Sequence, residues 1–378
     1  MNTIERKLRD RILPGLYKGK ALLLIGPRQV GKTTLLAQFV QKESDDTIWL
    51  NADLPEVRES LSQPTLQTIR NIVGNHRMLI IDEVQRLPNA GLLLKILVDN
   101  FKDVQCIATG SSSLEISETI FEPLTARYLQ FNLYPFMLSE LYPNQSAFEI
   151  QQTLDFHLIY GLYPEISLNP TIAETLLQNL ADQYLYKDVL IWKDIRKPEL
   201  LDKLLKLLAW QIGSEANIHE LANTLRVKSE TVESYIDLLE KSFVIFRLRS
   251  YSTNERKEIS KMSKIYFWDN GIRNAVLGKF EPLSMRNDDG QLWENFVISE
   301  RMKFLHGNGS RVKSYFWRNY NQSEVDYVEI DGERMAAYEI KWKQPSTKKT
   351  WVTRAFTNMY PQAHTGIVQP DQMMDFLN

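Results

Sequence analysis

The sequence predicts an α/β fold that begins with a doubly wound parallel sheet, continues through a helical middle region and ends in a second α/β domain. A glycine-containing loop at 26–33 lies between an apolar run and a helical pattern, and two more apolar runs follow with a helical pattern between them. At roughly 150 residues per domain, a chain of 378 residues has two or three domains. The pattern places them at 1–145, 146–265 and 266–378.

The composition narrows the class of protein. No continuous apolar stretch reaches transmembrane length, and Met1–Asp10 is charged, which predicts a cytoplasmic protein without a membrane partner. The single cysteine, Cys106, excludes an internal disulfide and a cysteine-cluster metal site, and its apolar neighbours predict an inert buried thiol. Because the formal net charge is only −2, any affinity for nucleic acid must come from local basic patches.

The first element is the apolar run Ala21–Ile25, a buried strand, followed by a loop and a helix that begins near Lys32. Two glycines let the loop turn its N–H groups inward, a lysine can reach the β- and γ-phosphates, and a threonine can ligate Mg²⁺ at the helix N-terminus. ATP and Mg²⁺ are therefore the expected cofactors, with Lys32 catalytic and Thr33 a metal ligand. The predicted nucleotide-binding residues are Gly26, Pro27, Arg28, Gln29, Val30, Gly31, Lys32, Thr33 and Thr34.

Two carboxylates follow the next buried run, Met78–Ile81. Ligands of open parallel sheets bind at the carboxyl edge, so Asp82 is expected to hold Mg²⁺, directly or through water, and Glu83 to orient or deprotonate the attacking water. Taken alone, the pair could be solvated acids that cap a strand. The phosphate loop upstream favours the catalytic interpretation, and together the two segments predict an ATPase.

A third apolar strand, Val104–Ala108, ends in Thr109-Gly110-Ser111-Ser112-Ser113, and a helical pattern at 91–101 separates it from the second strand. Thr109 is the first candidate for a residue that senses the γ-phosphate and Ser111 the second. Ordinary turn or helix-cap chemistry is the open alternative for these hydroxyls. The alternation of strands and helices through Phe131 completes the prediction of a doubly wound sheet.

The middle region reads as helices. Residues 153–213 are interpreted as a lid and connector, and residues 218–224 and 229–240, followed by a strand at 243–248, resemble a winged helix. A stripe of acids on the second of these helices would repel a phosphate backbone, so a packing or subunit-contact role is favoured over base reading. The stripe consists of Glu230, Glu233, Asp237 and Glu240.

Two alternating segments, 323–330 and 333–341, surround Asp331-Gly332 and predict a hairpin. A two-residue turn at that dipeptide would place Glu324 opposite Glu339 and Asp326 opposite Ala337. The period of two places one set of charged residues on a single face, where a divalent cation or a lysine is expected to offset the like charges. That set is Glu324, Asp326, Glu339 and Lys341.

Positive charge gathers in two stretches with aromatic residues between the cations, so phosphate backbones and unpaired bases are candidate partners. A solvated charged face is the open alternative. The cations are Arg247, Arg249, Arg256, Lys257, Lys261 and Lys264, then Lys341, Lys343, Lys348, Lys349 and Arg354, and the aromatic residues are Tyr251, Tyr266, Trp342 and Trp351.

In this order, the motifs resemble a family of prokaryotic AAA+-type ATPases whose C-terminal half carries a domain of unknown function with a restriction-endonuclease-like core. The resemblance runs nearly end to end, and the later motifs are more specific than the first two, which many ATPases share. The motifs are GPRQVGKTT (26–34), LIIDEVQRLP (79–88), TGSSS (109–113), TAR (125–127) followed by residues 133–140, GLYPE (161–165), KIYFWDNG (264–271), WENFV (293–297), EVDY (324–327) and EIK (339–341).

The resemblance implies a ring, commonly of six subunits, in which Arg127 is the candidate finger that reaches a neighbour's γ-phosphate. A surface arginine that leads into a strand is the open alternative, and Arg28 is a second candidate. Relatives usually have Gly-Arg where this chain has Ala126-Arg127.

The resemblance also implies the Asp…Glu-x-Lys signature of restriction-endonuclease-like nucleases. Asp326 and Glu339 would hold metal, Lys341 would help to activate water, and Glu294, on a helix at 292–304, would supply an outer carboxylate. Many such domains keep the fold without cleavage, so an inactive DNA-binding scaffold is the open alternative.

The expected function is that of an ATP-dependent, DNA-binding ring motor, a helicase or translocase acting on duplex or branched DNA, with nuclease activity as an optional second reaction. The alternative is a nucleotide-dependent conformational switch that uses an inactive nuclease-like domain to bind protein partners. DNA should stimulate the ATPase of a motor and leave that of a switch unchanged.

Overall fold

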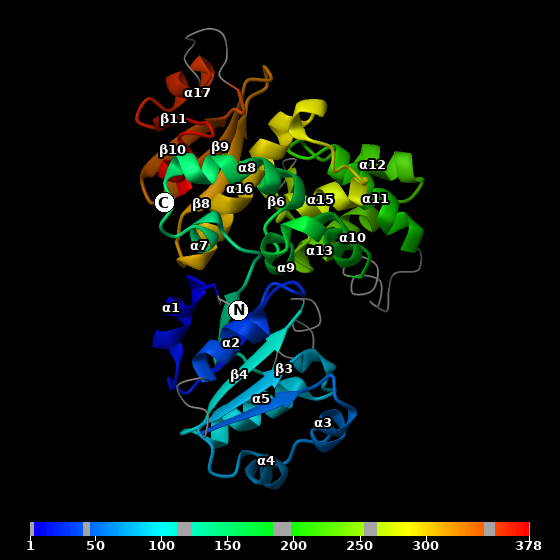
Figure 1. Ribbon diagram of the computed structural model, residues 1–378, viewed down its shortest axis with the longest axis vertical. Coiled ribbons are helices and arrows are strands. Elements are labelled where there is room, and N and C mark those ends of the chain that lie inside the picture. Colours follow the sequence, from blue (N-terminus) through cyan, green and yellow to red (C-terminus); the bar gives the residue numbers. More distant parts are fainter. Residues whose placement is uncertain are drawn as a thin grey trace. The chain divides into compact units, whose positions relative to one another are not determined.

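The structure, a computed structural model, describes residues 4–40, 46–111, 123–183, 198–252, 263–343 and 352–377. The chain forms two compact units, one of residues 1–134 with 241–243 and one of residues 135–240 with 244–378. Each unit is built on its own sheet (Figure 1). The predicted fold class is confirmed: a parallel sheet of the P-loop type is followed by a second, mixed α/β sheet.

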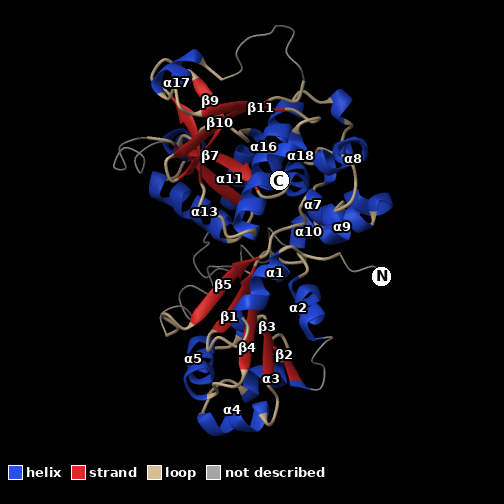
Figure 2. Ribbon diagram, turned by 90° about the vertical axis from the view of Figure 1, so that its left-hand side faces the viewer, coloured by secondary structure: helices blue, strands red, loops and turns tan. Residues whose placement is uncertain are grey.

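The first unit contains a five-stranded sheet in the order β2-β3-β4-β1-β5, in which all neighbouring strands are parallel (Figure 2). Strands β1 and β3 are buried along their whole length because every residue in them except the last of β3 is apolar. The strands are β1 (Ala21–Ile25), β2 (Thr47–Asn51), β3 (Met78–Asp82), β4 (Gln105–Gly110) and β5 (Tyr128–Asn132). The helices are α1 (Leu8–Ile12), α2 (Lys32–Val40), α3 (Pro55–Ser60), α4 (Leu66–Val73) and α5 (Ala90–Asn100).

The strands expected from the apolar runs are present, with one shift of boundary. Thr109 and Gly110 continue β4 instead of forming a turn after it. Cys106 is buried in this strand, and burial raises the pKa of its thiol to about 12, as expected for an inert cysteine. None of the helices in the described ranges combines the length and the apolar character needed to cross a bilayer.

The second unit contains a six-stranded mixed sheet in the order β11-β10-β9-β8-β6-β7. The strands are β6 (Ile245–Ser250), β7 (Ser263–Phe267), β8 (Lys313–Arg318), β9 (Glu324–Asp331), β10 (Arg334–Ile340) and β11 (His364–Val368). The helices are α7 (Leu138–Leu141), α8 (Ala147–Tyr160), α9 (Pro164–Leu168), α10 (Ala173–Gln183), α11 (Pro198–Trp210), α12 (Ile218–Leu225), α13 (Ser229–Lys241), α15 (Asn270–Leu277), α16 (Asp289–Gly307), α17 (Arg354–Met359) and α18 (Met373–Leu377).

The helix pair α12 and α13 lies where the sequence predicts it, but the strand that follows does not form a separate wing. Strand β6 pairs antiparallel with β7 and parallel with β8, so both β6 and β7 belong to the C-terminal sheet. The expected boundary at residue 265 therefore falls inside β7. A strand pattern cannot reveal this, because partners in a sheet are chosen by contacts distant in sequence.

Buried polar side chains tie residues 135–165 to the C-terminal part of the second unit. The Asp269 carboxylate accepts a hydrogen bond from the Leu162 N–H at 2.7 Å, and the Asn270 amide donates to the carbonyl oxygens of Leu158 and Leu292 at 3.3 and 3.0 Å. A Cβ on Gly271 would lie 2.2 Å from the Tyr160 carbonyl oxygen, so only glycine permits this approach. Residues 158–162 of the segment interpreted as a lid are thus packed within the second unit.

The C-terminal hairpin forms, but its turn is one residue later than predicted. Arg334 pairs with Asp331 and Tyr338 with Tyr327, so the two loop residues are Gly332 and Glu333. Gly332 has a φ of 59°, a left-handed conformation that glycine adopts without strain.

The later turn changes which residues face each other. Continuing the observed register by one step places Asp326 opposite Glu339, whereas Ala337 pairs with Val328. The predicted Glu324–Glu339 and Asp326–Ala337 pairings are therefore wrong. A shift of two residues keeps the parity of the strand, so the predicted sharing of one face still holds.

Candidate functional site

The phosphate loop joins β1 to α2 at the carboxyl edge of the first sheet. Gly31 has a φ of 89°, and a Cβ on Gly26 would lie 2.0 Å from the Leu133 carbonyl oxygen. Each glycine is thus required, one by backbone conformation and the other by close approach. The Lys32 ammonium donates to the carbonyl oxygens of Gly26 and Pro27 at 2.8 and 2.9 Å, which holds it inside the loop.

The remaining residues of the loop differ in how far they are buried. Val30 is fully buried, Arg28 is half-buried, and Gln29 is exposed. Thr33 and Thr34 are exposed in the first turn of α2. The hydroxyl side chains at the helix start are therefore accessible to a ligand.

An arginine outside every recognised motif anchors the loop. Arg6 is 5% exposed, and its guanidinium donates to the carbonyl oxygens of Val30 at 2.8 Å and of Tyr134 at 2.6 Å. It connects the loop to the end of the first unit. Sequence reasoning missed Arg6, because nothing near it in the chain signals a contact 24 residues away.

The Asp82 side chain, at the end of β3, is hydrogen-bonded to both the start of α2 and β4. The Thr33 hydroxyl donates to one Asp82 carboxylate oxygen at 3.0 Å, and the Thr109 hydroxyl donates to the other. Carboxylate and hydroxyl oxygens are the donors that Mg²⁺ prefers. The donor set of Thr33 and Asp82 therefore fits the metal that the sequence predicts, and Thr109 holds the carboxylate in place.

Glu83 stands next to this group in an unusual backbone conformation, with φ 53° and ψ 46°. Its N–H donates to the Thr109 hydroxyl at 3.1 Å. Its carboxylate accepts a hydrogen bond of 2.6 Å from the Gln85 amide, which also donates to the Ser111 hydroxyl at 3.0 Å. The structure thus brings both candidate sensor residues, Thr109 and Ser111, to the predicted carboxylates, whereas Ser112 and Ser113 lie outside the described residues.

Gln85 is a site residue that sequence reasoning missed. Its amide connects Glu83 to Ser111 across two strand ends. The signal was present, because Gln85 belongs to the LIIDEVQRLP motif at 79–88 and stands two residues after Glu83. Spacing alone does not indicate that the side chain turns back toward the carboxylate.

Arg127 lies at the opposite edge of the same sheet. Ala21 pairs with Tyr128, so Arg127 precedes the parallel strands at their amino ends, whereas the phosphate loop follows β1 at its carboxyl end. Its guanidinium donates to the Asp99 carboxylate at 2.8 Å. Arg127 is therefore not placed at the phosphate loop of its own subunit. The preceding residue, Ala126, has a φ of 64°, a left-handed backbone conformation that glycine would adopt without strain.

A second group of charged residues lies on one face of the C-terminal hairpin. The Lys341 ammonium contacts the carboxylates of Asp326 and Glu339, each at 2.9 Å, and the N–H of Ile340 also donates to Asp326 at 2.9 Å. The residues of the Asp…Glu-x-Lys signature are thus adjacent. Burial and then the neighbouring Asp326 raise the pKa of Glu339 to about 7, despite the lysine.

Lys264 completes this group, in contradiction to its predicted place in a surface patch. It is 3% exposed, and its ammonium contacts Glu324 at 2.6 Å and Glu294 at 3.3 Å. The Tyr266 hydroxyl donates to Glu294 at 2.6 Å. Burial lowers the pKa of Lys264, but the nearby carboxylates, Glu294 first, more than offset burial and raise the pKa overall. We call Lys264, Glu294, Glu324, Asp326, Glu339 and Lys341 the carboxylate cluster.

The metal assigned to Asp326, Glu339 and Glu294 stays a prediction. In the described parts of the chain, no group of three or more histidine, cysteine or acidic side chains is arranged to hold a metal ion. Asp326 and Glu339 share the ammonium of Lys341, and Glu294 is engaged by Lys264. Lysines therefore offset the like charges of the cluster, which is one of the two means of compensation that the sequence predicted.

The predicted basic patches are also revised. Arg247 is paired with Asp237 and, at 2.8 Å, with Glu240, so two acids of the α13 stripe hold an arginine of β6. This contact agrees with the packing role favoured for α13. Lys343 is paired with Asp289 at 2.5 Å. Arg256, Lys257, Lys261, Lys348, Lys349 and Trp351 lie outside the described residues.

The aromatic residues of these stretches are engaged within the fold. Tyr266 is fully buried, Trp342 contacts Trp293 with ring centres 5.5 Å apart, and Tyr251 contacts Tyr315 at 5.5 Å. These contacts place the rings in packing roles. Tyr251 and Trp342 are half-buried, so stacking of these two rings on unpaired bases stays a prediction.

Comparison with known proteins divides the chain into three matched segments. Residues 18–142 match the family described as AAA domain. Residues 151–283 and 289–376 match two families described as domains of unknown function, DUF8612 and DUF4143. The AAA domain match and the phosphate-loop geometry support an ATPase in the first unit.

Two relatives align over most of the chain. An uncharacterized protein of Mycobacterium tuberculosis is 28% identical over 345 residues, which cover 89% of this chain and 74% of the relative. An uncharacterized protein of Haemophilus influenzae is 23% identical over 343 residues, covering 85% and 82%.

Among solved structures, the Thermotoga maritima RuvB Holliday junction branch migration motor is 19% identical. The match covers 68% of this chain and 95% of that chain, with a TM-score of 0.31. At this TM-score, the likeness says nothing about what the chain acts on.

Proposed function

We propose that this protein is an ATP-dependent ring motor that binds duplex or branched DNA and translocates on it or remodels it. The observation that carries the ATPase part is the meeting of Thr33, Asp82 and Thr109 beside the phosphate loop. These residues come from three separate segments, and their contact supports a nucleotide site that is already assembled. The DNA-binding part is supported by exposed cations of the second unit.

Each side chain of the site has a distinct role in this proposal. Lys32 leaves the loop carbonyls and binds the β- and γ-phosphates, while the loop N–H groups bind the same oxygens. Thr33 and Asp82 would hold Mg²⁺, which supplies charge neutralisation at the transferred phosphoryl group. Glu83 accepts a hydrogen bond from the attacking water and orients it, and Thr109 fixes both the Asp82 carboxylate and the backbone of Glu83.

Replacing the lysine of the loop tests the ATPase. Lys32→Ala should abolish phosphate release, because the loop loses the cation that binds the β- and γ-phosphates in this proposal. Lys18→Ala, which changes an exposed lysine, is the matched control and should retain turnover. Calorimetry should detect ATP or ADP binding to the wild type. Wild-type turnover by a folded Lys32→Ala variant would refute the assignment of the loop.

The alternative is a nucleotide-dependent switch that binds protein partners through an inactive nuclease-like domain. One observation favours it: Lys264 and Lys341 already neutralise carboxylates of the cluster, so the cluster does not need a metal to be stable. DNA distinguishes the two functions. A motor should show ATP turnover stimulated several-fold by DNA with a steep salt dependence, whereas the turnover of a switch should not respond to any DNA form.

The ring part of the proposal assigns Arg127 to the active site of a neighbouring subunit. Arg127→Ala should lose activity and regain it when mixed with Lys32→Ala subunits, because each variant then supplies what the other lacks. Size-exclusion chromatography with light scattering checks that both variants assemble. An assembled mixture without recovered turnover would exclude the role in trans.

Cleavage of DNA is a second reaction to be tested at the carboxylate cluster. The adjacency of Asp326, Glu339 and Lys341 favours it, whereas the lysine contacts count against it. Wild-type protein is incubated with supercoiled, linear and branched DNA in Mg²⁺, beside Asp326→Ala. Nicking that Asp326→Ala abolishes while ATP hydrolysis persists would support cleavage. Absence of wild-type nicking on all three DNA forms would remove it from the proposal.

A further inference from the structure

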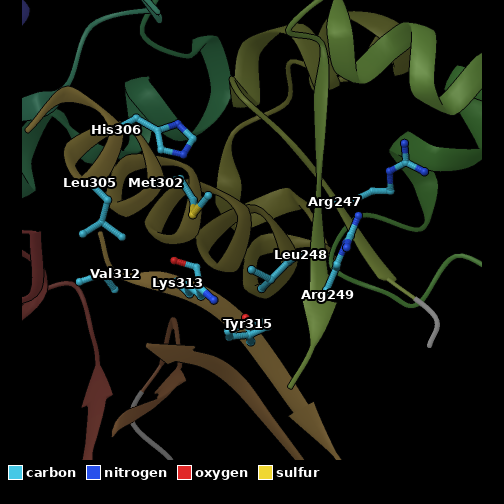
Figure 3. A pocket seen from close by; sticks show the side chains of 10 residues that line it. Arg247, Leu248, Arg249, Met302, Leu305, His306, Val312, Lys313 and Tyr315 are labelled. Atoms are coloured by element: carbon cyan, nitrogen blue, oxygen red, sulfur yellow. The ribbon is translucent and has the colours of Figure 1, made fainter. Parts of the chain in front are cut away.

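Strands β6 and β8 are neighbours in the second sheet but pair along only part of their length. The register joins Arg249 to Tyr315 and Ser250 to Phe316, at the carboxyl end of β6. Residues 245–248 of β6 have no counterpart in this pairing, so the two strands diverge toward their amino ends. A cavity of about 320 Å³ lies in the space between them (Figure 3). We call this space the strand wedge.

Helix α16 provides an apolar floor for the wedge. Met302 and Leu305 line it from this helix together with Leu248 of β6, and the exposed ring of His306 stands at its edge (Figure 3). Leu248 and Leu305 are buried, so the floor is part of the packed core. Met302 is half-buried, so among the three floor residues it is the one whose apolar surface is open to a ligand.

The walls of the wedge are cationic. Arg247, Arg249 and Lys313 line it, and none of its ten lining residues is acidic. The ion pairs with α13 hold Arg247 in place. Arg249 and Lys313 are both exposed, and neither has an ion-pair partner among the residues that the structure describes. Two cations are thus available to an anionic ligand.

We propose that the strand wedge binds single-stranded DNA, with consecutive phosphates at Arg249 and Lys313 and one base against Met302. An anion joined to an apolar planar group matches cationic walls around an apolar floor. A cavity of this size admits one nucleotide, and a base of a strand can enter only when it is unpaired and unstacked. The inference rests on the proposed action on DNA and specifies where a displaced or branched strand would be held.

Fluorescence anisotropy with a labelled twenty-nucleotide thymidine strand tests the wedge on the full chain. Arg249→Glu combined with Lys313→Glu should remove two phosphate contacts. The slope of log affinity against log salt should then fall by about 1.4, with affinity roughly ten- to thirtyfold weaker near 0.1 M salt. Arg249→Gln with Lys313→Gln should weaken binding less. Lys228→Glu with Arg334→Glu, two exposed cations outside the wedge, is the matched control and should bind as the wild type does.

An abasic strand of the same length tests the base contact at the floor separately from the phosphate contacts at the walls. The wild type should bind it more weakly than the thymidine strand, and the charge-reversal variant should not distinguish the two. Equal wild-type affinity for both strands would overturn the base contact, and tighter binding of a twenty-base-pair duplex would overturn the choice of single strand. Equal affinity of the wild type and the charge-reversal variant for the thymidine strand would overturn the wedge as a DNA site.

Measuring ATP turnover with and without DNA distinguishes a failure of the wedge proposal from a failure of the motor proposal. If DNA stimulates turnover while the charge-reversal variant binds as the wild type does, the wedge is overturned and the motor stands. If the wild type binds no DNA, both proposals fail, and the measured ATP turnover remains as evidence for the nucleotide site alone.

Discussion

Thr109→Val is the sharpest perturbation of the nucleotide site, because valine keeps the shape of the side chain and removes only the hydroxyl. That hydroxyl is fully buried, donates to the Asp82 carboxylate and accepts from the Glu83 N–H at 3.1 Å. Both residues carry proposed roles in hydrolysis. A single substitution therefore disturbs the proposed metal ligand, Asp82, and the proposed water-orienting residue, Glu83, together.

The hydrogen bonds lost set the expected size of the effect. A hydrogen bond to a charged group contributes about 1.5 to 3 kcal/mol, and a tenfold change in rate corresponds to about 1.4 kcal/mol. If the loss of the Asp82 contact is felt in the transition state, turnover should fall roughly ten- to hundredfold. Thr109→Ser keeps the hydroxyl and should retain most of the activity.

Three measurements separate a catalytic effect from a loss of structure. Phosphate release gives kcat and KM, calorimetry gives ADP affinity, and urea unfolding gives the stability of each variant. We expect kcat to fall while ADP affinity changes little. A folded Thr109→Val variant with wild-type kcat would refute the reasoning that the Thr109 hydroxyl positions the catalytic carboxylates.

Three further predictions concern stability. Ala126→Gly should stabilise the first unit by about 0.5 to 1 kcal/mol in urea unfolding, because Ala126 has a φ of 64°; a lower midpoint would contradict this. Lys264→Met should destabilise the second unit by about 3 to 5 kcal/mol, because it leaves buried carboxylates unpaired. Adding Glu294→Gln should recover part of this loss. If the free-energy changes of the two substitutions were fully additive, Lys264 and Glu294 would not be coupled. Burial lowers the pKa of His157 to about 4. Between pH 6.5 and 4, the unfolded state therefore binds a proton at this histidine and the folded state does not. Stability should therefore be lost as pH falls from about 6.5 to 4, by up to about 3 kcal/mol, and His157→Gln should flatten this dependence in unfolding curves measured across that range.

Parallel strands explain why the nucleotide site was predictable. The carboxyl ends of such strands meet at one edge, so residues that follow separate apolar runs converge without knowledge of their contacts. The contact of Thr33 with Asp82 and that of Asp82 with Thr109 follow from this rule. The fold class was predictable for the same reason, because apolar runs and helical periods are local properties.

Side-chain partners were less predictable. Lys264 was grouped with surface cations because its neighbours in sequence are basic, yet it is buried against carboxylates of α16 and β9. Arg247 was assigned to the same patch and is neutralised by α13. In each case the partner lies on a different element, and local sequence does not encode which elements pack together.

The amino-acid sequence by itself determined the phosphate loop, the order of elements and the face shared by the hairpin carboxylates, because glycine conformation, apolar periodicity and strand parity act over a few residues. Tertiary structure alone decided that β6 and β7 join the C-terminal sheet, that Asp326 faces Glu339, and that Lys264 lies among the carboxylates. These outcomes depend on strand pairing and burial between distant segments, where the gain from packing and charge neutralisation outweighs local preference.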